Sequence, residues 1–182
     1  PLVASISTTK AAQNGFLVKQ RLALEAARSV DTVLFDKTGT LTKGEFGVVE
    51  VWSTGGYAKD EVIELAASLD VLSEHPIARA VVAKAKEQGL SLRDPKKFEA
   101  IKGRGVKAMI GEQEVMVGGP ALLESLGVSV PSELSGSVQD AGQKGQTIVF
   151  TVRDKKLLGA IALADIIREE SREAITSLKE MG

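Results

Sequence analysis

Cysteine is absent from the 182-residue chain, which excludes disulfide bonds, thiolate metal sites and thiol catalysis from this sequence. An excess of positive charge is absent as well, because 23 Lys and Arg against 24 Asp and Glu leave a formal net charge of -1. Without a long-range positive field, the chain is not expected to bind nucleic acid. The sequence also lacks any run of about 18 or more apolar residues, so we expect no complete membrane-spanning helix within it.

The two ends of the sequence predict continuation. Residues 1–6 are short and mostly apolar and start without Met or a charged leader, so we expect them to be the end of a longer preceding segment. At the other end, a helical pattern over residues 168–179 is followed by Gly182, where a strand would be expected next.

Hydrophobic periodicity predicts a mixture of strands and helices. The compact apolar run at 32–35 predicts a buried strand that delivers a carboxylate into a glycine-containing loop, although such a strand cannot form a sheet alone. Further strands are predicted at 46–52, 98–101, 106–110, 114–117, 146–152 and 156–162. Helices are predicted at 11–15, 21–28, 62–69, 77–85, 120–125, 132–141 and 168–179. Short glycine turns predict an antiparallel meander in the middle of the chain, which is α+β, while the flanks are α/β.

The loop 36–42 carries the residues that indicate chemistry. It reads Asp36-Lys37-Thr38-Gly39-Thr40-Leu41-Thr42. An ionised carboxylate at a strand end can attack a phosphorus atom in line while backbone N–H groups and hydroxyls hold the equatorial oxygens. Gly39 lets the backbone approach the phosphoryl group, and Mg²⁺ held by Asp36 and the Thr38 carbonyl would neutralise the charge repulsion. The candidate catalytic residues are therefore Asp36, Lys37, Thr38 and Thr40.

On composition, this loop could equally be a turn capped by Asp36, since Asp, Thr and Gly are ordinary turn residues. The full string, however, resembles the phosphorylation signature of P-type ATPases. Phosphatases of the haloacid dehalogenase superfamily have a similar motif, but they carry a second aspartate two residues after the nucleophile as a general acid and base. That place is Thr38 here, which cannot shuttle a proton near neutral pH, so we expect the aspartyl-phosphate to persist.

The resemblance extends over essentially the whole chain to the heavy-metal-transporting branch of the P-type ATPases. Residues 73–76 match the His-Pro motif of that branch, in which the histidine lies against the adenine, and Pro76 suits the first turn of a helix. The family places a glutamate five residues before the histidine, where this chain has Asp70. Taken alone, a single histidine such as His75 at a helix start is more often structural.

Two glycine motifs complete the resemblance. Residues 103–106 match the family's Gly-x-Gly-Val, and residues 117–119 match a second site whose usual pair is Gly-Asn, so that Gly119 departs from the pattern. Glycines also make hairpin turns, and both roles can hold because a turn without side chains leaves room for a flat base. The implied nucleotide-binding residues are Asp70, Glu74, His75, Gly103, Gly105, Gly118 and Gly119. Trp52 and Phe98 are predicted to be core residues rather than stacking platforms.

Residues 164–168 resemble the family's return from the nucleotide-binding (N) domain into the phosphorylation (P) domain, with Asp165 and Arg168 at the hinge. From the residues alone, they predict a helix start with an acidic cap. The implied fold is α/β: a partial haloacid-dehalogenase-like, Rossmann-like P domain split by an inserted α+β N domain with an antiparallel sheet. The implied boundaries are 1–44 for the end of a membrane-helix extension and the first part of the P domain, 45–160 for the N domain, and 161–182 for the return into an incomplete P domain.

The resemblance implies the ATP-binding and phosphorylation region of an ATPase that transports a heavy-metal cation, copper being favoured, with ATP and Mg²⁺ as cofactors. The transported ion would be bound by membrane segments outside this chain, and the partners would be the protein's own actuator and membrane domains. The region would lie on the cytoplasmic side of a multi-pass membrane protein, and by itself it would not carry out transport. Two alternatives stay open: a soluble haloacid-dehalogenase-type phosphohydrolase, against which Thr38 argues, and a non-catalytic nucleotide-binding module.

Overall fold

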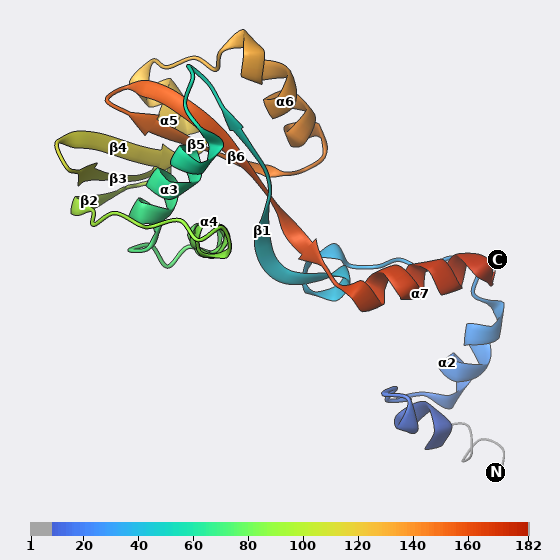
Figure 1. The fold of residues 1–182 in the computed structure, drawn as a ribbon. Helices are drawn as coiled ribbons and strands as arrows, with labels where there is room; N and C mark the ends of the chain where they lie inside the picture. The colour runs from blue at the N-terminus through green and yellow to red at the C-terminus, as the bar shows by residue number, and fades with distance from the viewer. Residues whose placement is uncertain (1–8, 182) are drawn as a thin grey trace.

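An antiparallel sheet organises the chain, for which the computed structural model describes residues 9–181 (Figure 1). Its strands are β1 (Thr42–Ser53), β2 (Lys96–Ile101), β3 (Gly105–Ile110), β4 (Gln113–Gly118), β5 (Thr147–Arg153) and β6 (Lys156–Ile167). The six strands lie in the order β1-β6-β5-β4-β3-β2, and every neighbouring pair is antiparallel. The predicted α/β fold with an antiparallel sheet is confirmed.

Helices flank the sheet and extend away from it. They are α2 (Arg21–Ala26), α3 (Lys59–Asp70), α4 (Pro76–Glu87), α5 (Pro120–Leu126), α6 (Ser132–Gln143) and α7 (Glu169–Glu180). A short helical turn, η1, covers Ala27–Ser29, and the turn labelled η2 covers Lys37–Leu41 with non-helical backbone at Thr38 and Gly39. Residues 9–13 form a further helical turn. In the part of the chain that the structure describes, no helix has both the length and the apolar character needed to cross a membrane.

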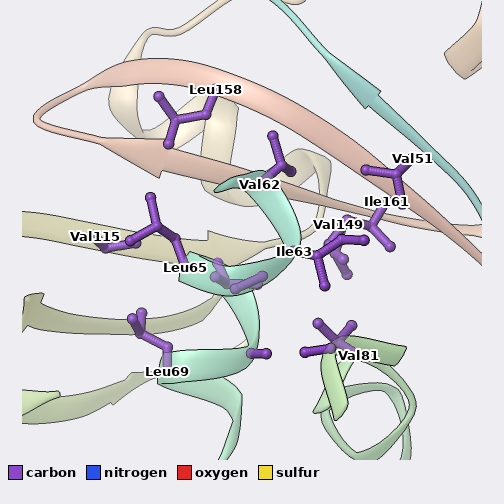
Figure 2. Close-up of a cluster of buried hydrophobic side chains, with 14 of the residues drawn as sticks. Val51, Val62, Ile63, Leu65, Leu69, Val81, Val115, Val149, Leu158 and Ile161 are labelled. Atoms are coloured by element: carbon purple, nitrogen blue, oxygen red, sulfur yellow. The ribbon is translucent and has the colours of Figure 1, made fainter. Parts of the chain in front are cut away.

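Alternation along the strands gives the sheet two buried faces. Val149 and Leu158 point into a core shared with α3 and α4, and their neighbours Phe150 and Leu157 point into a second core under α5 and α6. Figure 2 shows the first core, where side chains of α3 meet those of the strands. The two cores bury the sheet on both sides, which explains why β5 and β6 read as continuous apolar runs.

The predicted roles of the two aromatic residues agree with this packing. Trp52 lies partly buried against the second core, and Phe98 lies partly buried against the first. Neither side chain is among the residues that line the pocket described below.

Strands β1 and β6 are longer than their neighbours, with 12 residues each. They pair from Ser53 opposite Gly159 to Thr42 opposite Ile167, with register shifts on the way. At Gly159 a Cβ atom would lie 2.1 Å from the carbonyl oxygen of Trp52, so only glycine permits this close crossing. The pair runs out of the sheet as a two-stranded ribbon and carries η2 and α7 at its far end (Figure 1).

The predicted strand at 32–35 is wrong. These residues form neither helix nor strand, and Val33, Leu34 and Phe35 are 49%, 93% and 41% exposed. A β-strand is stabilised by hydrogen bonds to a neighbouring strand, and no strand of the described residues lies beside this segment.

Three further predictions concern the start of α7, the domain limits and the first residues of the chain. The predicted acidic cap is also wrong, because Asp165 lies inside β6 and the N-cap of α7 is Arg168, whose side chain makes no capping hydrogen bond. The predicted domain limits at 44/45 and 160/161 fall within β1 and β6, and the division into N and P domains stays a prediction. The predicted membrane-helix extension at residues 1–6 lies outside the described residues.

Candidate functional site

A pocket of about 510 Å³ opens between the ends of several elements: the end of α3, the start of α4, the β2–β3 turn and the paired strands β3 and β4. This volume is in the range of sites for small organic ligands. Most of the residues predicted to bind nucleotide come together in its lining: Asp70, His75, Gly103, Gly105, Gly118 and Gly119. Glu74 is exposed and is not part of this lining, so its role stays a prediction.

Two glycines shape the floor of the pocket. Gly105 on β3 pairs with Gly118 on β4, and a Cβ atom on Gly105 would lie 2.0 Å from the Val117 carbonyl oxygen. A Cβ atom on Gly118 would lie equally close, 2.0 Å, to the carbonyl oxygen of Arg104. The strands can therefore approach each other this closely only without side chains at these positions, and both glycines lie in the pocket lining. Gly119, by contrast, has open space where its Cβ would lie.

His75 is fixed by the start of α4. It is the N-cap residue, and its Nδ1 atom accepts a hydrogen bond from the Ile77 N–H at 3.2 Å, while Pro76 occupies the first helical position. In the neutral imidazole the proton must then lie on Nε2, which leaves a donor and the ring face available to a ligand. The structural and the ligand-binding interpretations of this histidine are thus compatible.

Asp70 is the last residue of α3 and is only 6% exposed. Burial raises the pKa of its carboxyl group from 3.8 to about 7. No hydrogen bond or ion pair of this carboxyl group occurs within the described residues. The group therefore lies near half-ionisation at neutral pH, at the edge of the pocket.

Sequence reasoning missed most of the other lining residues. Lys102 and Arg104 flank Gly103 in the β2–β3 turn and place two cations in the lining. Arg104 lies inside the glycine motif, so its position beside a ligand could have been inferred from that motif. The apolar walls include Ile77, Val117 and Val149. Val117 belongs to the second glycine motif, whereas Ile77 on α4 and Val149 on β5 reach the pocket only through tertiary packing, which no local pattern shows.

The loop after Asp36 forms a second candidate site. Asp36 has an extended backbone, and the turn that follows relies on Gly39, whose φ of 79° is unfavourable for other residues. The N–H of Gly39 donates to Oγ1 of Thr42 at 3.2 Å. The side chains of Asp36, Lys37, Thr38 and Thr40 are all exposed. The structure thus gathers the candidate catalytic residues on one open loop.

Thr42 connects this loop to the end of β6. Its hydroxyl lies 2.6 Å from Oδ2 of Asp165 and 3.0 Å from the Lys37 carbonyl oxygen, and the shorter contact to a carboxylate takes its proton. The N–H of Arg168 donates to the Leu41 carbonyl, and Nε of Arg168 donates to the Thr42 carbonyl, both at 3.0 Å. Thr42 and the two predicted hinge residues therefore form one hydrogen-bonded junction. Oδ1 of Asp165 is buried there without a partner in the described residues.

The oxygen atoms that the loop offers as metal ligands suit a magnesium ion better than a transition metal. No group of three or more His, Cys, Asp and Glu side chains that could hold a metal occurs among residues 9–181. Mg²⁺ prefers oxygen ligands and commonly takes only one or two protein carboxylates together with water and phosphate oxygens. The Asp36 carboxylate and the Thr38 carbonyl fit that requirement.

Comparison with known proteins agrees with this architecture. A family model described as haloacid dehalogenase-like hydrolase matches residues 30–182. The chain therefore belongs to the haloacid dehalogenase-like hydrolase family.

Its relatives narrow the class further. The chain is 43% identical over 182 residues to the copper-exporting P-type ATPase B of Archaeoglobus fulgidus and 35% identical to the probable copper-exporting P-type ATPase V of Mycobacterium tuberculosis. The matches cover 100% of this chain but only 26% and 24% of those proteins. The chain thus spans about a quarter of the length of the curated relatives it matches, and the predicted resemblance to heavy-metal P-type ATPases is confirmed.

Solved structures give the same picture. A zinc-transporting PIB-type ATPase in its E2.Pi state superposes with a TM-score of 0.83 at 32% identity, covering 98% of this chain and 29% of that one. The catalytic domain of the CPx-ATPase CopB-B, studied upon nucleotide binding, superposes with a TM-score of 0.65 at 25% identity, covering 94% of this chain and 58% of that one.

Proposed function

We propose that the pocket binds the adenine base of ATP. The observation that carries this proposal is the convergence of His75, Asp70 and the glycine pair on one cavity, although these residues come from separate elements. The histidine ring offers a face for stacking, the glycine floor admits a flat ring, and the two cations of the β2–β3 turn suit a polyphosphate. The likeness to a catalytic domain studied upon nucleotide binding supports the same assignment.

Removal of the His75 ring tests this site. We expect His75→Ala to weaken ATP binding by about 1 to 2 kcal/mol, the size of a lost stacking or hydrogen-bond contact. Isothermal titration calorimetry on the 182-residue chain measures the change directly. Arg79→Ala is the matched control, because Arg79 is exposed on the same helix and does not line the pocket. Unchanged affinity in His75→Ala would remove this residue from the site.

We further propose that Asp36 accepts the γ-phosphoryl group of ATP. A carboxylate oxygen of Asp36 forms the new bond to phosphorus, the bond from phosphorus to the bridging oxygen breaks, and ADP leaves with the electron pair. Mg²⁺, held by Asp36 and the Thr38 carbonyl, would supply charge neutralisation when bound. The N–H groups and hydroxyls of the loop would hold the phosphoryl oxygens. Lys37 and Thr40 are exposed on the same loop and would contact the phosphate.

The absence of a nearby proton shuttle supports a pump rather than a phosphatase. Thr38 occupies the place two residues after the nucleophile and cannot act as a general base near neutral pH. The acyl phosphate would therefore persist long enough to be coupled to a movement elsewhere in the protein. With copper-exporting relatives over the whole chain, the favoured function is ATP-driven transport of copper across a membrane. The copper ion would be bound by membrane segments outside this chain, and the chain would lie on the cytoplasmic side.

Phosphorylation of the full-length protein tests this second step. With radiolabelled ATP, Mg²⁺ and copper, we expect an acid-stable, hydroxylamine-sensitive adduct that disappears in Asp36→Asn. Asp31→Asn is a suitable control because Asp31 is another exposed aspartate before the loop. Label on a different side chain, or on none, would reject the assignment. Steady release of phosphate from small phosphomonoesters would instead favour a phosphohydrolase.

A further inference from the structure

The carboxyl group of Asp70 is unusual in its surroundings. It lies in the pocket lining, belongs to a residue that is 6% exposed, and has no hydrogen-bond donor within the described residues. Buried carboxylates are normally paired or hydrogen-bonded, because an unpaired charge in a low-dielectric site is unfavourable. A group of this kind facing a cavity indicates that the ligand supplies its partner.

The charges around Asp70 do not provide that partner. The other ionisable side chains in the pocket lining are His75 at the start of α4 and Lys102 and Arg104 in the β2–β3 turn. Four ion pairs lie on α3, α4, the neighbouring strands and the segment before β2, and none of their residues is part of the lining: Glu64–Arg93, Lys84–Glu87, Lys107–Glu99 and Arg153–Glu61. Burial is the cause of the raised pKa of Asp70.

The base edge of adenine distinguishes the two charge states of this carboxyl group. An ionised carboxylate only accepts hydrogen bonds, so it can use the N6 amino group but leaves the N1 acceptor facing a negative charge. A neutral carboxylic acid accepts from N6–H with its carbonyl oxygen and donates its O–H to N1. Because a bound base also displaces water from the pocket, the neutral form gains further over the charged form.

We propose that Asp70 binds the adenine edge as a neutral carboxylic acid, so that ATP binding takes up one proton from solution. This inference rests on the proposed nucleotide site and concerns how that site recognises the base. ATP affinity then depends on the fraction of Asp70 that is protonated before binding.

The pH dependence of ATP affinity gives the first test, because the two charge states predict opposite slopes. For the neutral acid, ATP affinity falls by about fiftyfold between pH 7 and pH 9. For the ionised form it would rise about twofold over the same interval. A wild-type affinity that rises or stays level from pH 7 to pH 9 overturns the proposal.

Asp70→Asn is the matched variant. Its amide presents the same donor and acceptor as the neutral acid but cannot ionise. We expect its ATP affinity to lie within about threefold of wild type at pH 7 and to be level up to pH 9. Other titrating groups, including the phosphates of ATP, contribute equally to wild type and variant, so the difference between the two pH profiles reports Asp70 alone. A slope equal to that of wild type would assign the titration to another group and overturn the proposal.

Calorimetry in two buffers gives an independent readout. At pH 8 the observed binding enthalpy should change with the ionisation enthalpy of the buffer, with a slope close to one proton taken up per ATP. The slope should be close to zero in Asp70→Asn. ATP binding with no proton uptake in the wild type would overturn this inference alone. Failure of ATP to bind at any pH would overturn the proposed nucleotide site as well.

Discussion

The sheet region, residues 42–167, and the segment before it, residues 9–41, use apolar side chains differently. The hydrophobic core residues run from Val51 to Leu163. In the earlier segment, Leu34 is 93% exposed and Leu17 is 84% exposed. Both regions contain apolar β-branched runs, so the pattern alone does not decide burial. A run becomes core only where another element covers it.

The same contrast applies to the two candidate sites. The pocket is assembled from α3 and α4, which pack on one face of the sheet, and from strands of the sheet itself. The loop with Asp36 is ordered by its own turn and by the Thr42 junction, while its candidate catalytic side chains are exposed. Within the described residues, the proposed nucleotide pocket is therefore enclosed by packed elements, whereas the proposed phosphorylation loop is open to solvent.

Replacement of one leucine in each region tests the contrast most strongly. Leu158 on β6 is 0% exposed and belongs to the core shared with α3, whereas Leu34 is 93% exposed. We expect Leu158→Ala to lower the free energy of unfolding by about 3 to 4 kcal/mol, because it removes buried methyl groups and leaves a cavity. Leu34→Ala should change it by less than about 0.5 kcal/mol. Urea denaturation measures both, and equal effects would contradict the comparison.

Two adjacent glycines in the pocket lining, Gly118 and Gly119, allow a similar comparison between a crowded and an open position. A Cβ at Gly118 would meet a backbone carbonyl at 2.0 Å, whereas one at Gly119 would meet nothing within 4 Å. Gly118→Ala should cost about 3 kcal/mol of stability, because β3 and β4 must separate. Gly119→Ala should be close to neutral, apart from any direct effect on the base. Thermal denaturation without ATP measures the effect on stability, and the additional stabilisation with ATP measures the effect on binding. An unchanged melting temperature in Gly118→Ala would mean that the strands can move apart freely.

The pH dependence of stability provides a third comparison, between a buried and an exposed aspartate. Folding raises the pKa of Asp70 from 3.8 to about 7, so the folded chain binds more protons than the unfolded chain between these values. The contribution of the Asp70 carboxyl group to the free energy of unfolding is therefore fully present below about pH 4. It is lost as the pH rises to about 7.

Relative to Asp70→Asn, wild type should therefore lose roughly 2 to 3 kcal/mol of unfolding free energy between pH 5 and pH 8. Asp31→Asn, in the exposed segment, should show no such difference from wild type. Urea titrations at the two pH values measure the change. Parallel behaviour of wild type and Asp70→Asn would indicate that Asp70 is solvated in the folded chain.

The sequence predicted the elements of the sheet region well, because their patterns are self-contained. The helices containing Val62 and Ile77, and the glycine-bounded strands around Val106 and Val117, each form close to the predicted limits. The motif with His75 was recognisable from the adjacent proline, which fixes the start of α4. Strand β6 ran further than predicted, since its last residues pair with β1 beyond the apolar run.

Properties that depend on distant contacts could not be predicted. The prediction of a strand at 32–35 was wrong because the pattern shows only that these residues are apolar. It does not show whether a neighbouring strand is present. The isolation of Asp70 depends on how α3 packs against the sheet, and its motif position gave no indication of its charge state. The bond from Thr42 to Asp165 joins residues 123 positions apart, and neither residue type signals the other.

This last contact offers the smallest effect and tests where the two regions are joined. Thr42→Val keeps the shape of the side chain but removes its hydroxyl, leaving Oδ2 of Asp165 without its 2.6 Å partner. A lost hydrogen bond to a charged group predicts a cost of about 1 to 2 kcal/mol. Because the junction lies at the far end of the β1–β6 ribbon, the loss should fall on the loop and α7 rather than on the sheet.

Hydrogen exchange resolves that difference. In Thr42→Val, the Gly39 and Arg168 amides should exchange faster, since one donates to the Thr42 hydroxyl and the other to the Leu41 carbonyl beside it. Amides of β4 and β5 should keep their protection. Thr40→Val is the matched control, because Thr40 is exposed on the same loop. Faster exchange throughout the sheet would show that the junction supports the whole fold, and the two regions would then form one cooperative unit.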